Sequence, residues 1–408
     1  MNLQKNNSFH FIVVFSFILL FSKTLYAKIE WVPVVRLQGL GGQFFFEGEQ
    51  TSFSGNADWV LAPGIKFSDR WSLIPTVSGK YQRVREVQEL IGGGFLTRET
   101  FENTALLKGI YQLNESWKIK LKGSYKNQLL VESADEKLGK GLFDNNKLSV
   151  GTELERTGSI FRSIRLSFDP YGVRFPRYQT LVSGSSFGSE VNSGVNTLDF
   201  NAYDITYSME CLLSSKILLA LSALGSYRPY TDQTLVTTSG EYENNKRLDF
   251  FAQLNTNIAY KLPDIPWLPI QNVLGLDTSY AFLDSNQHNY DASRTQFNTQ
   301  YYDYSEFHLA PKWIGRLFEK LDFVIAYDYG KRIYTERLIQ NSDGAYQTSK
   351  IYLNIHSITY TFKYPWKYGL SLLASGTYRR SLSNMAYERT YRYNYYAQHY
   401  FIGFSWEY

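Results

Sequence analysis

Residues 116–126 read Ser-Trp-Lys-Ile-Lys-Leu-Lys-Gly-Ser-Tyr-Lys, and this stretch decides the fold class. Apolar side chains alternate in it with lysines. The apolar face is formed by Trp117, Ile119, Leu121 and Tyr125. The lysine face is formed by Lys118, Lys120, Lys122 and Lys126. Strict alternation with a period of two predicts a β-strand whose two faces meet different environments.

The same alternation recurs along the whole chain, in sixteen segments. They span residues 31–47, 57–68, 71–84, 100–113, 116–128, 146–156, 160–170, 196–212, 215–228, 247–262, 269–284, 302–315, 319–334, 347–364, 367–381 and 396–408. No stretch after residue 27 offers the ~18 uncharged apolar residues of a membrane-spanning helix, so strands are the predicted elements.

The connections between these segments alternate in length. Short turns fall near residues 69–70, 114–115, 157–159, 213–214, 263–268, 316–318 and 365–366. Longer polar loops fall at residues 48–56, 85–99, 129–145, 171–195, 229–246, 285–301, 335–346 and 382–395. Short turns that alternate with long loops are typical of an outer-membrane β-barrel, in which the short turns face the periplasm.

The eight tryptophans follow the same division. Seven lie at the short-turn end of a segment: Trp31, Trp71, Trp117, Trp267, Trp313, Trp366 and Trp406. Only Trp59 is predicted at a long-loop end. Amphipathic rings gather at a membrane–water interface, so this sorting predicts an aromatic girdle.

Together these patterns predict an all-β fold, a transmembrane antiparallel β-barrel of about 16 strands, with 14 or 18 strands as alternatives. The sheet has to close because an unpaired backbone group costs several kcal/mol in hydrocarbon. Pro33, Pro63, Pro75 and Pro311 fall inside the segments. Since proline cannot donate to a ladder, these positions predict bulges, strand ends or shifted boundaries.

Residues 1–27 have the features of a cleaved signal peptide, which leaves residues 28–408 as the barrel domain. Lys5 precedes an apolar run over residues 9–21, and Ala27 supplies the small residue at the cleavage site. The alternative is an N-terminal anchor helix, for which the apolar run is short. A net charge of +4 does not indicate a nucleic-acid partner, and the single cysteine excludes an internal disulfide.

The last segment alternates apolar residues and stops on an aromatic one. These residues are Ile402, Phe404, Trp406 and Tyr408. The pattern resembles the C-terminal β-signal of Gram-negative outer-membrane proteins, with Tyr in place of the usual Phe. The resemblance implies export to the Gram-negative outer membrane, recognition by the barrel-assembly machinery, and contact with outer-membrane lipid and lipopolysaccharide. An ordinary edge strand is the alternative explanation.

At the level of architecture the chain resembles a porin-type outer-membrane barrel, without matching a specific family. The resemblance implies a channel for passive diffusion of small hydrophilic solutes, either as a homo-oligomer or with periplasmic partners. One alternative is an export gate for an envelope polysaccharide, which an aromatic-rich lumen would favour. Another is a structural or surface-binding barrel with a sealed lumen.

Charged residues of neighbouring strands are predicted to face the lumen in rows, because a charge facing lipid costs ~2–4 kcal/mol. These lumen rows are Lys118, Lys120, Lys122, Lys126, Glu153, Glu155 and Arg165. They could select solutes by the sign of their charge. The alternative is a solvated ladder of cross-strand ion pairs, each worth under ~1 kcal/mol.

The loop after the fifth strand resembles, by its position, the loop that narrows general porins. Its candidate constriction residues are Glu132, Asp135 and Glu136, and loop 171–195 is an alternative lid. No enzymatic activity, metal or cofactor is expected. Gly184-Ser-Ser-Phe-Gly188 spells a nucleophile-elbow motif, but the motif needs a strand-to-helix turn that this loop does not predict.

Overall fold

A computed structural model of the chain describes residues 29–47, 52–83, 86–89, 94–97, 99–131, 136–178, 196–263, 270–318, 320–388 and 392–408. These residues form 22 strands. Within the same residues there is no helix with the length and apolar character needed to cross a membrane. The predicted signal peptide lies outside the described residues.

Eighteen strands form one antiparallel sheet. They are β1 (Glu30–Val32), β2 (Val35–Phe46), β3 (Ser52–Leu61), β4 (Gly64–Lys66), β5 (Trp71–Gln82), β8 (Glu99–Gln112), β9 (Trp117–Val131), β10 (Asn145–Arg156), β11 (Phe161–Arg174), β12 (Phe200–Ser214), β13 (Ile217–Val236), β14 (Tyr242–Lys261), β15 (Ile270–Ser285), β18 (Tyr304–Leu317), β19 (Leu321–Gln340), β20 (Tyr346–Pro365), β21 (Leu370–Ser383) and β22 (Tyr395–Glu407). β1 pairs with β4, β2 pairs with β3, and both β3 and β4 pair with β5. From β5 onward each strand of the sheet pairs with the next one along the chain.

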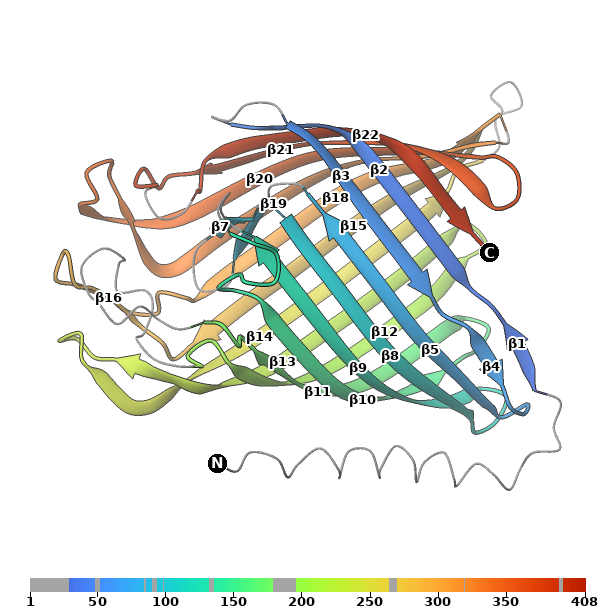
Figure 1. Cartoon of the computed structure of the whole chain (residues 1–408), viewed down its shortest axis with the longest axis horizontal. Helices are drawn as coiled ribbons and strands as arrows, with labels where there is room; N and C mark the ends of the chain where they lie inside the picture. The colour runs from blue at the N-terminus through green and yellow to red at the C-terminus, as the bar shows by residue number, and fades with distance from the viewer. Residues whose placement is uncertain are drawn as a thin grey trace.

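The sheet closes into a barrel because β22 pairs with β2, from Arg36 opposite Glu407 to Phe46 opposite Ala397. Figure 1 shows this seam where the first and last strands of the wall lie side by side. β1 continues as β2 and β3 continues as β4, so the wall has sixteen strands. The prediction of an all-β barrel of about 16 strands is confirmed.

Two prolines explain why two wall strands are interrupted. β1 ends before Pro33, and β3 ends before Pro63. Pro75 instead lies within β5, opposite Leu107. Pro311 lies within β18, where the pairing with β19 skips two residues. A missing N–H group thus ends or disturbs the ladder without opening the barrel.

The outer surface of the barrel carries a band of exposed apolar side chains. Leu148, Val150 and Leu166 are between 52% and 63% exposed, although they lie in the middle of their strands. A water-soluble protein buries such residues, whereas a lipid-facing barrel presents them outward. The charged residues that alternate with them therefore face the interior.

Some connections differ from the predicted loops. Residues 229–246 and 335–346 continue as strands, so β13–β14 and β19–β20 form long hairpins that extend beyond the rest of the wall (Figure 1). Two small hairpins lie inside other loops, β6 (Glu86–Glu89) with β7 (Gly94–Thr97) and β16 (Asn289–Asp291) with β17 (Gln296–Asn298). Polar and charged residues continue these strands, so apolar alternation no longer marks them.

The position of Trp59 also differs from the prediction. Its strand run begins at Ser52 rather than at residue 57, so Trp59 lies near the middle of the run and not at the long-loop end. Trp71, Trp117, Trp313 and Trp406 lie close to strand ends on the short-turn side. Trp267 is outside the described residues.

Candidate functional site: the barrel lumen

The strands β9 and β10 carry most of the charged residues that were predicted to face the lumen. The strand register places Lys120 opposite Glu153 and Lys118 opposite Glu155. Residues opposite each other in an antiparallel pair face the same side. The neighbouring residues of the other parity, Leu121 among them, are exposed on the outside. The predicted lumen rows of these two strands therefore share one inward face.

Most of the predicted lumen cations have a carboxylate partner. Lys120 Nζ lies 2.6 Å from Glu153 and 2.5 Å from Glu155. The other pairs are Lys122 with Asp169 at 2.7 Å, Lys126 with Glu102 at 2.6 Å and Arg165 with Glu210 at 2.7 Å. Lys118 forms no ion pair with a described residue. This part of the wall is a ladder of ion pairs, to which Lys118 adds a positive charge without a carboxylate partner among the described residues.

Glu136 is the one predicted constriction residue that the structure describes; Glu132 and Asp135 lie outside the described residues. Glu136 accepts a hydrogen bond from the backbone N–H of Leu142, within its own loop. Asp144, which is buried, binds Arg177 at 2.8 Å and so ties the loop to the end of β11. The described part of this loop lines neither of the two lumen cavities described below, and its role as a constriction stays a prediction.

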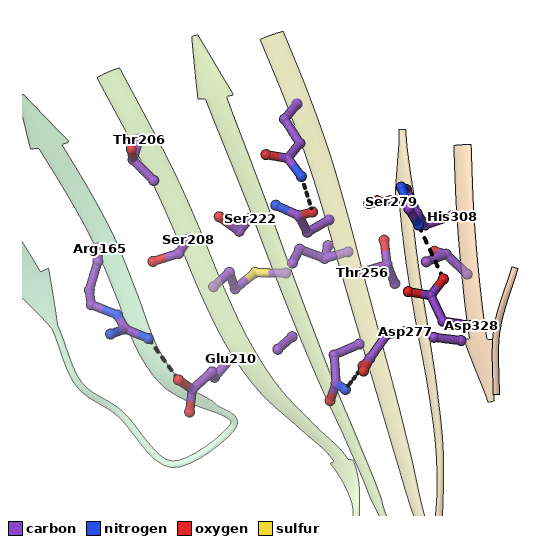
Figure 2. Close-up of a pocket in the computed structure, with 18 residues that line it drawn as sticks. Arg165, Thr206, Ser208, Glu210, Ser222, Thr256, Asp277, Ser279, His308 and Asp328 are labelled. Atoms are coloured by element: carbon purple, nitrogen blue, oxygen red, sulfur yellow. Dashed lines mark hydrogen bonds and ion pairs between the residues drawn. The ribbon is translucent and has the colours of Figure 1, made fainter. Parts of the chain in front are cut away.

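A cavity of about 740 Å³ lies against the wall formed by β11 to β15, β18 and β19 (Figure 2). Its middle is lined by uncharged hydroxyl and amide groups: Thr206, Ser208, Ser222, Gln253, Asn255 and Ser279. The Arg165–Glu210 ion pair lies at one side of the cavity and the His308–Asp328 contact at the other (Figure 2). The cavity is thus polar and well supplied with hydrogen-bonding groups.

The amide row of this cavity was not among the predicted site residues. Its signal is nevertheless present in the sequence, because Gln253, Asn255 and Asn257 alternate with Leu254 and Ile258. Gln253 donates a hydrogen bond to Asn255 at 3.0 Å. The predicted rows contain charged residues only. They omit uncharged polar residues that alternate with apolar ones in the same way.

His308 connects two carboxylates across the wall. Its Nε2 lies 2.7 Å from Glu306 and its Nδ1 lies 3.1 Å from Asp328. Each ring nitrogen thus faces one carboxylate. Arg332 binds the second oxygen of Glu306 at 2.6 Å. Glu306 of β18 is therefore held between His308 of the same strand and Arg332 of β19.

Aromatic side chains and buried arginines fill the outer mouth of the barrel. Tyr302 packs with residues at the ends of β11 and β12, and the Arg247 guanidinium lies 4.2 Å from its ring centre. The neighbouring Tyr301 lies 4.1 Å from the guanidinium of Arg337, which also contacts the rings of Tyr334 and Tyr393. The segment before β18 therefore joins opposite parts of the mouth.

Within the described residues, no three His, Cys, Asp or Glu side chains are grouped as metal ligands. Cys211, at the short-turn end of β12, is buried and free. The Gly184–Gly188 motif lies outside the described residues, and so do the residues directly after it, where a helix would be needed.

The fold and the lumen together define a transmembrane β-barrel of the outer-membrane type, with a polar interior and an apolar belt. No family model matches the sequence, and no curated protein matches it. Solved structures do resemble it. OmpT of Vibrio cholerae is 12% identical over 93% of this chain and 97% of that chain, with a TM-score of 0.46.

Two further solved structures have comparable similarity. OccD3 (OpdP) of Pseudomonas aeruginosa is 9% identical over 92% of this chain and 91% of that chain, with a TM-score of 0.47. A bacterial polysaccharide outer membrane secretin is 9% identical over 92% of this chain and 98% of that chain, with a TM-score of 0.42.

Proposed function

We propose that the protein is a Gram-negative outer-membrane channel through which small hydrophilic solutes diffuse. The observation that supports this most is the 740 Å³ lumen cavity with its hydroxyl and amide lining. A solute that enters such a lumen exchanges part of its hydration shell for groups on the wall, at little energetic cost. The lysine–carboxylate ladder lowers the net field, which suits uncharged solutes such as short saccharides.

No chemical step and no cofactor belong to this proposal. Lipid and lipopolysaccharide would surround the apolar belt, and the barrel-assembly machinery would recognise the segment ending in Ile402, Phe404, Trp406 and Tyr408. In the structure this segment lies at the seam, where Tyr408 exchanges backbone hydrogen bonds with Val35 at 2.8 and 2.9 Å. An assembly signal that also closes the barrel would couple recognition to closure.

The first test is single-channel conductance of the exported protein in a planar bilayer with a salt gradient. The proposal expects steady openings of one defined size. It also expects Lys118→Gln, Lys120→Gln and Lys122→Gln together to shift the reversal potential toward cations, because Glu153, Glu155 and Asp169 lose their counterions. Lys331→Gln is the control, since Lys331 is exposed and lies opposite the outward-facing Phe307.

A polysaccharide export gate is the second candidate, favoured by the aromatic mouth around Tyr301, Tyr302, Tyr334 and Tyr393. The same recording separates the two functions. A folded barrel that stays closed under all conditions contradicts passive diffusion. A barrel that opens only when a soluble polysaccharide is added on one side would support export. A barrel that stays closed even with the polysaccharide present would support a sealed, structural barrel.

A further inference from the structure

A second cavity in the lumen, of about 240 Å³, lies between the outer ends of β18 and β22. Both charged and apolar groups line it. The charged groups are Glu306, His308, Arg332, Arg379 and Arg392. The apolar groups are Leu353, Ile355 and the rings of Tyr393 and Tyr395, and the strand register places Leu353 and Ile355 between Arg332 and Arg379. We call this second cavity the arginine pocket.

Positive charge exceeds negative charge in the arginine pocket. Among the described residues, Glu306 is the only carboxylate that lines it, and Glu306 is already bound by both Arg332 and His308. Arg379 and Arg392 form no ion pair with a described residue, and the Nε of Arg379 is buried without a hydrogen-bond partner among them. Among the described residues, neither of these two guanidinium groups has an anion as a partner. A bound anion would supply the acceptor that the buried donor of Arg379 lacks.

The apolar lining groups of the pocket suit an apolar body. Leu353, Tyr393 and Tyr395 are between 4% and 7% exposed, so their positions are fixed by packing. Tyr393 and Leu353 belong to one buried cluster with Tyr334 and Ile351. The pocket thus offers rigid apolar groups beside two guanidinium groups.

We propose that the arginine pocket binds a small organic carboxylate. A carboxylate matches the planar donor fork of a guanidinium and can be held by two parallel hydrogen bonds. Its carbon skeleton would contact Leu353, Ile355 and the tyrosine rings. The volume accommodates a monocyclic or short-chain acid rather than a polymer. The proposal deepens the proposed function, because it rests on solute reaching this pocket through the lumen.

The binding test uses three probes of similar shape: benzoate, benzyl alcohol and benzylammonium. Calorimetric titration into the detergent-solubilised barrel should detect benzoate, with at least tenfold weaker binding of the neutral and cationic probes. Equal binding of benzoate and benzyl alcohol would overturn the role of the arginines. Inorganic phosphate is a fourth probe. If phosphate bound as tightly as benzoate, the apolar lining groups would have no role in binding, which would contradict the proposal.

The variant test uses two adjacent arginines of β21. Arg379→Gln should weaken benzoate binding at least tenfold. Arg380→Gln is the matched control, because Arg380 is exposed and lies opposite Tyr396 on the lipid-facing side. Equal loss in both variants, or no loss in Arg379→Gln, would contradict the proposal. Arg392→Gln, at the end of a loop, supplies a second variant should Arg379→Gln fail to fold.

Conductance separates this proposal from the proposed function. In a conducting wild-type barrel, benzoate should produce brief current blocks that Arg379→Gln removes and Arg380→Gln retains. A barrel that does not conduct would overturn passive diffusion, while calorimetry would still report on the arginine pocket. A barrel that conducts but neither binds benzoate nor shows blocks would overturn the arginine pocket alone.

Discussion

Lys120 lies between two carboxylates, with Glu153 opposite it in the register and Glu155 two residues farther along β10. All three side chains are only 14–15% exposed, so water screens them little. One ammonium group thus serves two carboxylates of the same strand. At the scale of single residues, the wall strands hold their charges by pairing them across the ladder.

Asp303 is a different case, because it lies in the outer mouth and is almost fully buried. Burial raises the pKa of Asp303 to about 6, although a hydrogen bond from the Ser285 backbone N–H at 2.8 Å acts in the opposite direction. The folded protein therefore binds a proton more readily at this site than the unfolded chain does. The contribution of Asp303 to the free energy of unfolding should therefore rise as the pH falls from about 6 toward 3.8.

We predict that Asp303→Asn removes this pH dependence. Above the raised pKa the neutral variant should be more stable than the wild type, by up to about 3 kcal/mol for a shift of two pKa units. The difference should disappear as the pH approaches 4, where both side chains are neutral. Denaturant unfolding in detergent at several pH values measures it, and a difference that does not change with pH would contradict the prediction.

At the scale of elements, the sequence predicts most strands to within a few residues. The prediction succeeds where a strand has lipid on one face and the lumen on the other, as β9 does. It fails at the outer ends of β13, β14, β19 and β20, where polar residues continue the strand. Side chains there such as Arg247 and Arg337 are buried against aromatic rings of other elements. Contacts of this kind leave no alternating apolar pattern in the sequence.

The same reasoning explains what could be predicted of the lumen. Lys120 and Glu153 lie on consecutive strands, and consecutive strands of an antiparallel barrel are neighbours, so their row follows from the sequence. The arginine pocket joins β18 to the start of β22, and the mouth joins Tyr301 to Arg337 and Tyr393. Those contacts depend on barrel curvature and on how loops fold, which strand alternation does not encode.

The seam between β2 and β22 depends on glycine. A side-chain carbon at Gly403 would lie 1.8 Å from the carbonyl oxygen of Gly39, and one at Gly42 would lie 1.9 Å from that of Tyr400. Neither contact can be relieved by rotating a side chain, because both oxygens belong to the backbone. The two strands therefore approach closely only because these positions lack a side chain.

We predict that Gly403→Ala weakens closure of the barrel, with a loss of about 1–3 kcal/mol or more, as is typical of overpacking. The fraction that keeps its compact, fast-migrating form on unheated gels should fall, and the unfolding temperature should drop. Gly225→Ala is the control, because no atom lies within 4 Å of the added carbon. Equal behaviour of the two variants would show that the seam tolerates a side chain.

At the scale of the whole molecule, the segment before β18 determines how open the outer mouth is. Tyr301 and Tyr302 both belong to the buried cluster at the ends of β11 and β12. Tyr302 also lies against Arg247 of β14, and Tyr301 against Arg337 of β19. Both tyrosines are only 3–4% exposed, so their rings hold this segment between β11 and β19 in the mouth.

We predict that Tyr301→Ala with Tyr302→Ala increases single-channel conductance, because each lost ring removes about 3–5 kcal/mol of packing. The segment would then no longer be held across the mouth. Tyr368→Ala is the control, since Tyr368 is 94% exposed in the short turn between β20 and β21. Unchanged conductance in the double variant would place the narrowest point of the lumen elsewhere.

The two long hairpins, β13–β14 and β19–β20, affect which part of the protein is contacted first by particles outside the cell. Their tips are tight turns, Thr237–Glu241 and Asn341–Ala345, each closed by backbone hydrogen bonds and a glycine with φ near +80°. Both tips lie against neighbouring loops: a side-chain carbon at Gly240 would lie 2.4 Å from the ring of Tyr290, and one at Gly344 would lie 2.9 Å from that of Tyr387. The two glycines therefore have to stay, while the residues around them can change. Antibodies and bacteriophages would contact these tips first, and a foreign epitope inserted there would be displayed on the cell surface.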